Sequence, residues 1–396
     1  MTRVVLVTGD AAAVPAVAAA TAVRAAGSGL RTLLLAADDP HRLLDEQLGT
    51  RLSGRAVGLA DGLWAVRLDE QEAFRHAVAG LDGKLRTGFE LLGVDPLESD
   101  ELTALPGTRQ LALLRALRLP DGAYDLLVVA APPPAELTAA LALPEQLDRY
   151  LSRLLPEQRQ AARALRPLLA AVVGMPMPAD WIYSARSWAA AELAATRAVI
   201  ESPRTSVRLA VDAWSCSPAA LRRAAAGLAL FGHRLDAVAA HAGLPAAALD
   251  SADPWLAEQA ARERDKLAAI DLGVPLLTAD RTAEGPAAVA AQLYREYQGR
   301  EFGAGPEPAE RWPWTAEDRL AEDGVLLWRL AAPGAERADL ELVRRGDELV
   351  VGLGPYRRIL PLPGALRRCT VAGAALRDGE LTLRFAPDPD LWPARK

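Results

Sequence analysis

Short apolar runs alternate with longer stretches of helical character over the first 300 residues of the chain. The apolar runs are bounded by turn or polar residues, which is typical of strands. They cover residues 4–7, 32–35, 63–67, 126–129, 207–211, 237–240 and 274–277. Because near-continuous apolar runs belong to strands covered on both faces, the pattern predicts an α/β fold with a doubly wound, mostly parallel sheet.

Two long regions lack any strand pattern, about residues 70–120 and 145–200. Both are rich in helix-forming residues, and we interpret them as a helical subdomain inserted at one end of the sheet. The α/β domain with this insertion is predicted to span residues 1–298.

The hydrophobic pattern changes after a segment rich in glycine and proline, residues 299–315, which we interpret as a linker. In residues 316–396 the apolar positions alternate, as at Leu381, Leu383 and Phe385, which follow the turn at residues 378–380. A second turn at residues 345–348 precedes another apolar run. This region is predicted to be a small antiparallel β-sandwich.

Composition and charge narrow the possible partners. The formal net charge of −6 gives no electrostatic reason to expect nucleic acid or an anionic membrane as a partner. The longest uncharged apolar stretch, residues 11–23, contains Pro15 and Thr21 and falls short of the roughly 20 residues of a membrane span. The chain begins directly on a predicted strand, so we expect a cytoplasmic protein without stable membrane insertion.

The residues that most often bind metals are few and scattered. Cys216 and Cys369 lie far apart, and the four histidines show no ligand spacing. We therefore expect no structural metal site and no disulfide framework.

The segment at residues 4–21 has the order of a phosphate-binding loop, with an apolar strand, a glycine and an alanine-rich helix. Its chemistry is missing, because no lysine occurs in the first 83 residues and no hydroxyl side chain lies between Thr8 and Thr21. The loop positions are Gly9, Asp10, Ala11, Ala12, Ala13, Val14, Pro15, Ala16 and Val17.

Three blocks of sequence, at residues 4–50, 124–151 and 206–238, resemble the ArsA family of deviant P-loop ATPases in order and spacing. That family includes arsenite-pump ATPases and the ATPases that target tail-anchored membrane proteins. The segment RRGDELVVGLGPYRRILPLP, residues 344–363, resembles the α-crystallin-type, small-heat-shock-like domain of some bacterial members. The resemblance implies a P-loop NTPase fold followed by that domain.

The family's loop pattern, G-K-G-G-V-G-K-[ST]-[ST], matches this chain only at Gly9. Asp10 stands in place of the lysine that reaches the partner subunit's nucleotide, and Pro15 in place of the second lysine. Ala16 replaces the hydroxyl that holds Mg²⁺. Each lost charged contact is worth roughly 1.5–3 kcal/mol, so three together cost about 5–9 kcal/mol.

Three further positions matter by the same resemblance. Asp39 matches the aspartate that orients the attacking water, and we interpret it as a relic that now serves as an N-cap or turn residue before a helix. Ala130 stands where an acid near Mg²⁺ is expected. His241 stands at the adenine-reading asparagine, and an ordinary loop histidine is the alternative.

In the targeting ATPases, the helical subdomains of two subunits form an apolar groove for a client helix. Methionine and aromatic side chains in the corresponding region are typical of adaptable binding surfaces, and core packing explains them as well. The candidate client-binding residues are Phe89, Leu92, Met175, Met177, Trp181, Ile182, Tyr183 and Trp188.

From these substitutions we expect a catalytically inactive ArsA paralogue without cofactor, acting as a dimer subunit, regulator or client-binding scaffold. The expected partner is an ArsA-family paralogue or a second copy of this chain, and a hydrophobic protein or small-molecule client is a further candidate. One alternative is an ATPase with an unconventional site, which would need ATP and Mg²⁺. The other is a chaperone-like holdase for apolar clients.

Overall fold

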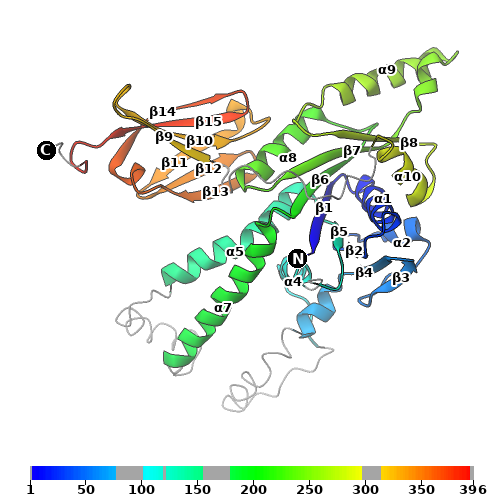
Figure 1. Cartoon of the computed structure of the whole chain (residues 1–396), viewed down its shortest axis with the longest axis horizontal. Helices are drawn as coiled ribbons and strands as arrows, with labels where there is room; N and C mark the ends of the chain where they lie inside the picture. The colour runs from blue at the N-terminus through cyan, green and yellow to red at the C-terminus, as the bar shows by residue number, and fades with distance from the viewer. Residues whose placement is uncertain (1, 77–100, 119–121, 155–178, 297–313, 393–396) are drawn as a thin grey trace. The chain divides into compact units, whose positions relative to one another are not determined.

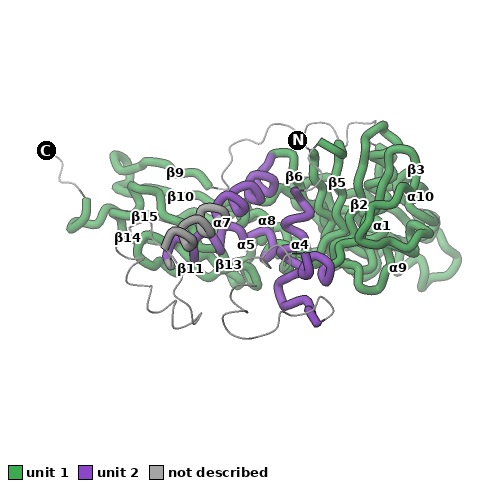
Figure 2. Tube along the Cα trace, turned by 90° about the horizontal axis from the view of Figure 1, so that it is seen from below, with its two compact units in different colours: residues 1–69, 120–138, 203–396 green, residues 70–119, 139–202 purple. Residues whose placement is uncertain are grey.

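The computed structural model describes residues 2–76, 101–118, 122–154, 179–296 and 314–392. The chain divides into two compact units, drawn in green and purple in Figure 2. The first contains residues 1–69, 120–138 and 203–396, and the second contains residues 70–119 and 139–202.

The first unit is built around an eight-stranded sheet with the order β3-β4-β2-β5-β1-β6-β7-β8 (Figure 1). All neighbouring strands are parallel except β3, which runs antiparallel to β4. The predicted doubly wound, mostly parallel sheet is confirmed. The strands are β1 (Arg3–Gly9), β2 (Thr32–Ala36), β3 (Val57–Ala60), β4 (Leu63–Arg67), β5 (Leu126–Ala130), β6 (Thr205–Asp212), β7 (Leu235–Gly243) and β8 (Leu276–Asp280).

Two strand predictions differ from the structure. The strand predicted at residues 274–277 begins at Leu276, because Gly273 adopts a left-handed turn conformation and Pro275 lacks a backbone donor for the ladder. The edge strand β3 was not predicted, since it is only four residues long, contains Gly58 and alternates between half-buried and exposed positions.

One face of the sheet is covered by α1 (Ala13–Gly27), which packs against α10 (Gly285–Leu293). Alanine fills most of α1, so the helix axis can approach the strands closely, and eleven of its residues are buried. The remaining helices of this α/β region are α2 (Leu43–Leu48), α8 (Pro218–Leu230), the 3-10 turn η1 (Ala246–Asp250) and α9 (Pro254–Ala268).

The C-terminal region of the first unit consists of two antiparallel sheets, with strand orders β14-β15-β10-β9 and β11-β12-β13. Trp328 and Phe385 are fully buried between them, and the predicted β-sandwich is confirmed. The strands are β9 (Trp314–Arg319), β10 (Val325–Ala331), β11 (Leu340–Arg345), β12 (Glu348–Leu353), β13 (Tyr356–Pro361), β14 (Cys369–Arg377) and β15 (Glu380–Pro387).

The predicted linker at residues 299–315 lies mostly outside the described residues. The predicted linker extends two residues too far. Trp314 and Thr315 already belong to β9 and pair with Leu330 and Arg329 of β10. Both predicted hairpin turns are present, with left-handed Gly346 between β11 and β12 and left-handed Asp378 and Gly379 between β14 and β15.

In the second unit, every regular element that the structure describes is helical. These elements are the helical residues 70–76, α4 (Thr108–Ala116), the part of α5 (Pro134–Leu154) from Ala139 onward, and α7 (Ala179–Ile200). Arg118 pairs with Glu192 within this unit. Among the described residues, no helix is both long enough and apolar enough to cross a membrane.

Candidate functional site

The loop at residues 9–17, which has the order of a phosphate-binding loop, lies at the carboxyl end of β1, between β5 and β6 of the sheet. This edge is where ligands bind in open α/β sheets. Gly9 ends the strand with φ +145°, and a Cβ added there would lie 1.9 Å from the carbonyl oxygen of Ala210. The chain therefore passes β6 so closely that only glycine fits.

Three backbone donors of the loop are bonded to backbone carbonyl oxygens of the protein. Asp10 N–H donates to Ala210 O at 2.9 Å, and the N–H groups of Ala13 and Val14 both donate to Asp10 O, at 2.9 and 3.0 Å. Pro15, the third residue of α1, has no N–H to give. A phosphate-binding loop instead directs successive free N–H groups at the anion. This loop is thus a tight turn that leads straight into a helix.

The carboxylate of Asp10 is held against the next strand. Its Oδ2 accepts a hydrogen bond from the backbone N–H of Asp212 at 2.9 Å. The Asp212 carboxylate, in turn, accepts from Ser215 N–H at 3.0 Å. Two acidic side chains therefore lie at the loop, and both would repel an anion that approached it.

The first turn of α1 is packed into the hydrophobic core. The side chains of Ala13, Val14, Ala16 and Val17 are each at most 3% exposed, and Pro15 is also buried. Ala11 and Ala12, by contrast, are exposed. The positions of the second lysine and of the Mg²⁺-holding hydroxyl are occupied by apolar atoms that stabilise the helix–sheet contact.

Asp39 is engaged with both of its carboxylate oxygens. Oδ1 accepts from Leu43 N–H at 2.7 Å, and Oδ2 accepts from Leu44 N–H at 3.1 Å and from the Arg67 guanidinium at 2.9 Å. Arg67 also donates to Asp45 at 2.6 Å. This side chain caps the first turn of α2 and pairs with a half-buried cation, so its oxygens have partners other than a water nucleophile.

Asp45, which shares Arg67 with Asp39, also accepts a hydrogen bond from Arg42. Burial alone would raise the pKa of Asp45, but hydrogen bonds from Arg67 and Arg42 outweigh it and hold that pKa below its usual value. Arg42 Nε lies 2.7 Å from Asp45 Oδ2, so this arginine is committed to α2 and not to the loop. Arg24 lies in the last turn of α1, at the opposite end of that helix from the loop.

Ala130 is the last residue of β5, and His241 lies two residues before the carboxyl end of β7. Ala130 is fully buried, and its carbonyl oxygen accepts from the N–H groups of Ala37 and Asp38. His241 is half-buried on β7, where burial lowers the pKa of its imidazole. At these two positions the family pattern expects an acid and an asparagine. This chain has instead the methyl group of Ala130 and the His241 imidazole, whose neutral form is favoured by burial.

The structure brings further polar residues to this edge that the sequence did not single out. Trp214 follows β6, is 40% exposed and is stacked by the Arg281 guanidinium, whose carbon lies 5.9 Å from the ring centroid. Lys266 of α9 donates to Trp214 O at 3.2 Å. Lys266 is one of only three lysines in the chain, and that rarity was the one available signal.

The candidate client-binding residues cannot be placed by their side chains. Phe89, Leu92, Met175 and Met177 lie outside the described residues. The other four lie in α7, in a stretch where only the backbone is described: Trp181, Ile182, Tyr183 and Trp188. Their role stays a prediction.

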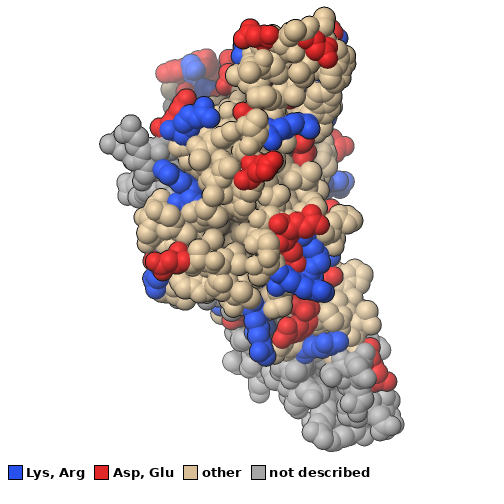
Figure 3. All heavy atoms as spheres, turned by 90° about the vertical axis from the view of Figure 1, so that its right-hand side faces the viewer, with Lys and Arg blue, Asp and Glu red and all other residues tan. Residues whose placement is uncertain are grey.

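Within the described part of the chain, no group of three or more His, Cys, Asp or Glu side chains could hold a metal ion. Cys216 and Cys369 are buried, free thiols. Burial raises the pKa of both thiols, which disfavours the thiolate that would bind a metal or react. Acidic and basic side chains are interspersed over the face shown in Figure 3.

Comparison with known proteins shows that two family models match this chain. A family model described as an anion-transporting ATPase matches residues 2–271, and one described as an HSP20-like domain found in ArsA matches residues 323–385. An uncharacterized protein of Streptomyces coelicolor is 46% identical over 95% of each chain. A protein of Mycobacterium tuberculosis is 29% identical over 95% of this chain and 94% of its own. A protein of Aquifex aeolicus with the provisional name of arsenical pump-driving ATPase 1 is 22% identical over 93% of this chain and 95% of its own.

Proposed function

We propose that this chain, which belongs to the ArsA family of anion-transporting ATPases, acts in that family without hydrolysing ATP, as a dimer subunit, regulator or client-binding scaffold. One observation carries the proposal. The residue at the position of the family's first lysine is Asp10, and its carboxylate is bound to the N–H of Asp212 instead of being free to move.

The energetics support the same proposal. The chain lacks the two lysines and the hydroxyl of the family loop, and their contacts to phosphate and Mg²⁺ would together supply about 5–9 kcal/mol. A helix N-terminus alone contributes only about 0.3–1 kcal/mol to anion binding at an exposed site. Here two of the helix's first N–H groups are already bonded to Asp10 O.

The choice of partner follows from the charge of Asp10. The family resemblance implies that two ATPase cores face each other across their nucleotide sites, so Asp10 would lie near the facing loop. An identical subunit would present a second carboxylate there, whereas a paralogue with an intact loop would present a lysine. We therefore infer that a heterodimer with an active paralogue is favoured over a closed homodimer.

The rate of phosphate release tests whether the chain hydrolyses ATP. The purified chain, incubated with ATP and Mg²⁺, is expected to release phosphate no faster than buffer. The variant Asp39→Asn serves as the control, because it alters the only family catalytic position that is retained. Phosphate release that survives repurification and disappears in Asp39→Asn would support the alternative of an ATPase with an unconventional site.

Heterodimer formation is tested by co-expression with a paralogue that carries an intact loop. Mass photometry then measures the fraction of heterodimers. We expect heterodimers with the wild-type chain and fewer of them with Asp10→Lys. Asp61→Lys, an equal charge change in the exposed turn between β3 and β4, is the matched control and should leave pairing unchanged. A stable homodimer that is indifferent to Asp10→Lys would contradict the proposal.

A further inference from the structure

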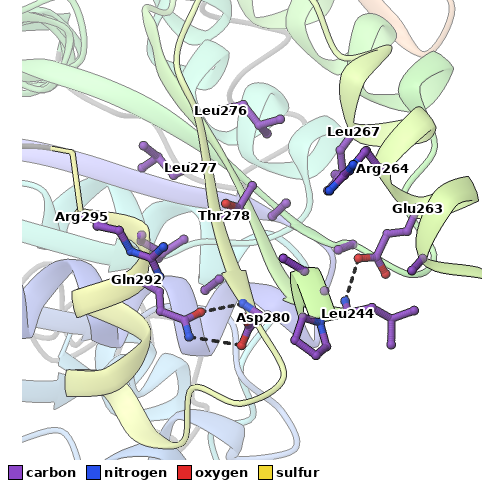
Figure 4. Close-up of a pocket in the computed structure, with 18 of the residues that line it drawn as sticks. Leu244, Glu263, Arg264, Leu267, Leu276, Leu277, Thr278, Asp280, Gln292 and Arg295 are labelled. Atoms are coloured by element: carbon purple, nitrogen blue, oxygen red, sulfur yellow. Dashed lines mark hydrogen bonds between the residues drawn. The ribbon is translucent and has the colours of Figure 1, made fainter. Parts of the chain in front are cut away.

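A cavity of about 790 Å³ lies at the free edge of the sheet, against β8 (Figure 4). Its walls come from η1, α9 and the end of α10, and leucine side chains provide much of the lining, including Leu244, Leu267 and Leu276. In the sheet order, β6 and β7 separate β8 from the former phosphate-binding loop on β1. Three strand spacings separate β8 from β1 by about 14 Å, and the lining of this cavity contains none of the loop residues 9–17.

One acidic side chain in the lining is almost completely buried. Glu263, on α9, is 6% exposed, and its Oε1 accepts a hydrogen bond from the Leu244 backbone N–H at 2.7 Å (Figure 4). A Cβ added to Gly243 would lie 2.9 Å from that oxygen, so the glycine leaves room for the carboxyl group. The local chain is therefore shaped around Glu263.

The second oxygen of this carboxyl group, Oε2, is buried and has no hydrogen-bond partner. Burial raises the pKa of Glu263, while the Leu244 N–H, Arg281 and Lys266 act in the opposite direction and Asp212 adds to the rise. Both cations interact elsewhere, since Lys266 donates to Trp214 O and Arg281 stacks on the Trp214 ring. An unpaired buried carboxyl oxygen is rare in proteins and costs free energy unless a donor is supplied.

The other polar side chains of the lining already accept hydrogen bonds or are exposed to water. Asp280 accepts hydrogen bonds from Gln292 Nε2 and from the Thr282 N–H. Arg264 and Arg295 are exposed, so water can solvate their guanidinium groups. Glu263 is therefore the lining residue that most needs a ligand atom, and that atom must be a hydrogen-bond donor.

We propose that the cavity binds a small molecule with an apolar body and a protonated amine. Its ammonium group donates to Glu263 Oε2, and its body contacts the leucine side chains of the lining. This site is independent of the proposed function, because it requires neither nucleotide nor a partner subunit.

Three probes of the same shape test the proposal: 3-phenylpropylammonium, 3-phenylpropan-1-ol and 3-phenylpropanoate. Each is titrated into the full chain and followed by the methyl NMR signals of its leucines. We expect the ammonium to bind at least about tenfold more tightly than the alcohol, and the carboxylate to bind most weakly. Shifts confined to leucines of the lining would place the binding in this cavity.

Two variants separate binding from folding. Glu263→Gln keeps an acceptor for the Leu244 N–H and is expected to abolish the preference for the ammonium over the alcohol. Glu258→Gln, on the exposed side of the same helix, is the matched control and should keep that preference. Thr278→Trp, at an exposed lining position, should block all three probes without altering Glu263. Equal affinity for the three probes, a preference for the carboxylate, or an unchanged preference in Glu263→Gln would overturn the proposal.

Discussion

At the scale of single residues, the substitutions at the former loop are structurally consistent with one another. Pro15 could replace a lysine because the first turn of a helix needs no N–H at that position, and Ala16 fills space in the core. Gly9 remains for a reason unrelated to phosphate, since β6 passes too close for any side chain. A glycine at this position of the loop is therefore no evidence of nucleotide binding.

The close approach at Gly9 gives a stability prediction. In Gly9→Ala, the Cβ would collide with Ala210 O and the backbone would be strained, which should lower the free energy of unfolding by about 3 kcal/mol or more. Gly27→Ala is the control, because that site is exposed at the end of α1 with nothing within 4 Å. It should be neutral or stabilising by up to about 1 kcal/mol. Urea denaturation measures both, and equal effects would contradict the geometry.

The ion pairs of Arg67 give a second prediction. Arg67→Met would leave Asp39 and Asp45 without their shared guanidinium, and both carboxylates are largely buried. We expect a loss of about 3 kcal/mol of unfolding free energy. Arg31→Met removes an arginine–aspartate pair of similar length, to Asp125, that is exposed to solvent. Its denaturation midpoint should stay unchanged within error, and a loss equal to that of Arg67→Met would contradict the role of burial.

Single residues also mark the limit of sequence reasoning. The missing lysines and hydroxyl were visible in the sequence, but the bond from Asp212 N–H to Asp10 joins residues 202 positions apart. Glu263 belongs to a helix with several charged residues, and it is buried while its neighbours Arg262 and Arg264 are exposed. No local pattern distinguishes that glutamate, because its burial depends on where η1 and β7 pass.

At the scale of elements, the apolar runs predicted the strands well, since a strand buried on both faces needs a continuous apolar sequence. The prediction failed where tertiary contacts decide, as at the half-buried edge strand β3 and at β8, whose start is displaced by Gly273 and Pro275. The contact between α8 and the sandwich was also not predictable. Ala226 and Leu230 of α8 belong to the hydrophobic core of the sandwich.

That contact can be tested at one point. A Cβ added to Gly227 of α8 would lie 2.5 Å from ring atoms of Tyr356. We expect Gly227→Ala to lower the thermal unfolding temperature of the sandwich in the wild-type background. In a Tyr356→Ala background the same change should have little effect or stabilise, because the ring is gone and alanine favours the helix. Equal effects of Gly227→Ala in both backgrounds would show that the two residues do not pack together.

At the scale of the whole molecule, stability should depend on His233. Burial and, secondarily, Arg358 lower the pKa of this histidine from 6.5 to about 4. Its Nε2 is buried without a hydrogen-bond partner. The unfolded chain therefore binds a proton between pH 6.5 and 4 that the folded chain does not, and stability falls as the pH falls through that range. The loss amounts to at most roughly 3 kcal/mol.

His233→Leu isolates this contribution. The variant removes the titrating group, so the difference in unfolding free energy between wild type and variant should be constant above pH 7 and should shift toward the variant between pH 6 and about pH 4. Chemical denaturation across this range measures the difference. Parallel curves for the two proteins over the whole range would contradict a buried, neutral His233.

The central claim is that the former loop has lost nucleotide binding, and calorimetric titration of the full chain with Mg·ATP tests it most directly. We predict no saturable heat up to about 1 mM nucleotide, because the loop offers a fixed carboxylate and few free donors where phosphate would bind. A family member with an intact loop, titrated in the same way, serves as the positive control and should bind Mg·ATP. Micromolar affinity of the wild-type chain for Mg·ATP would contradict the account.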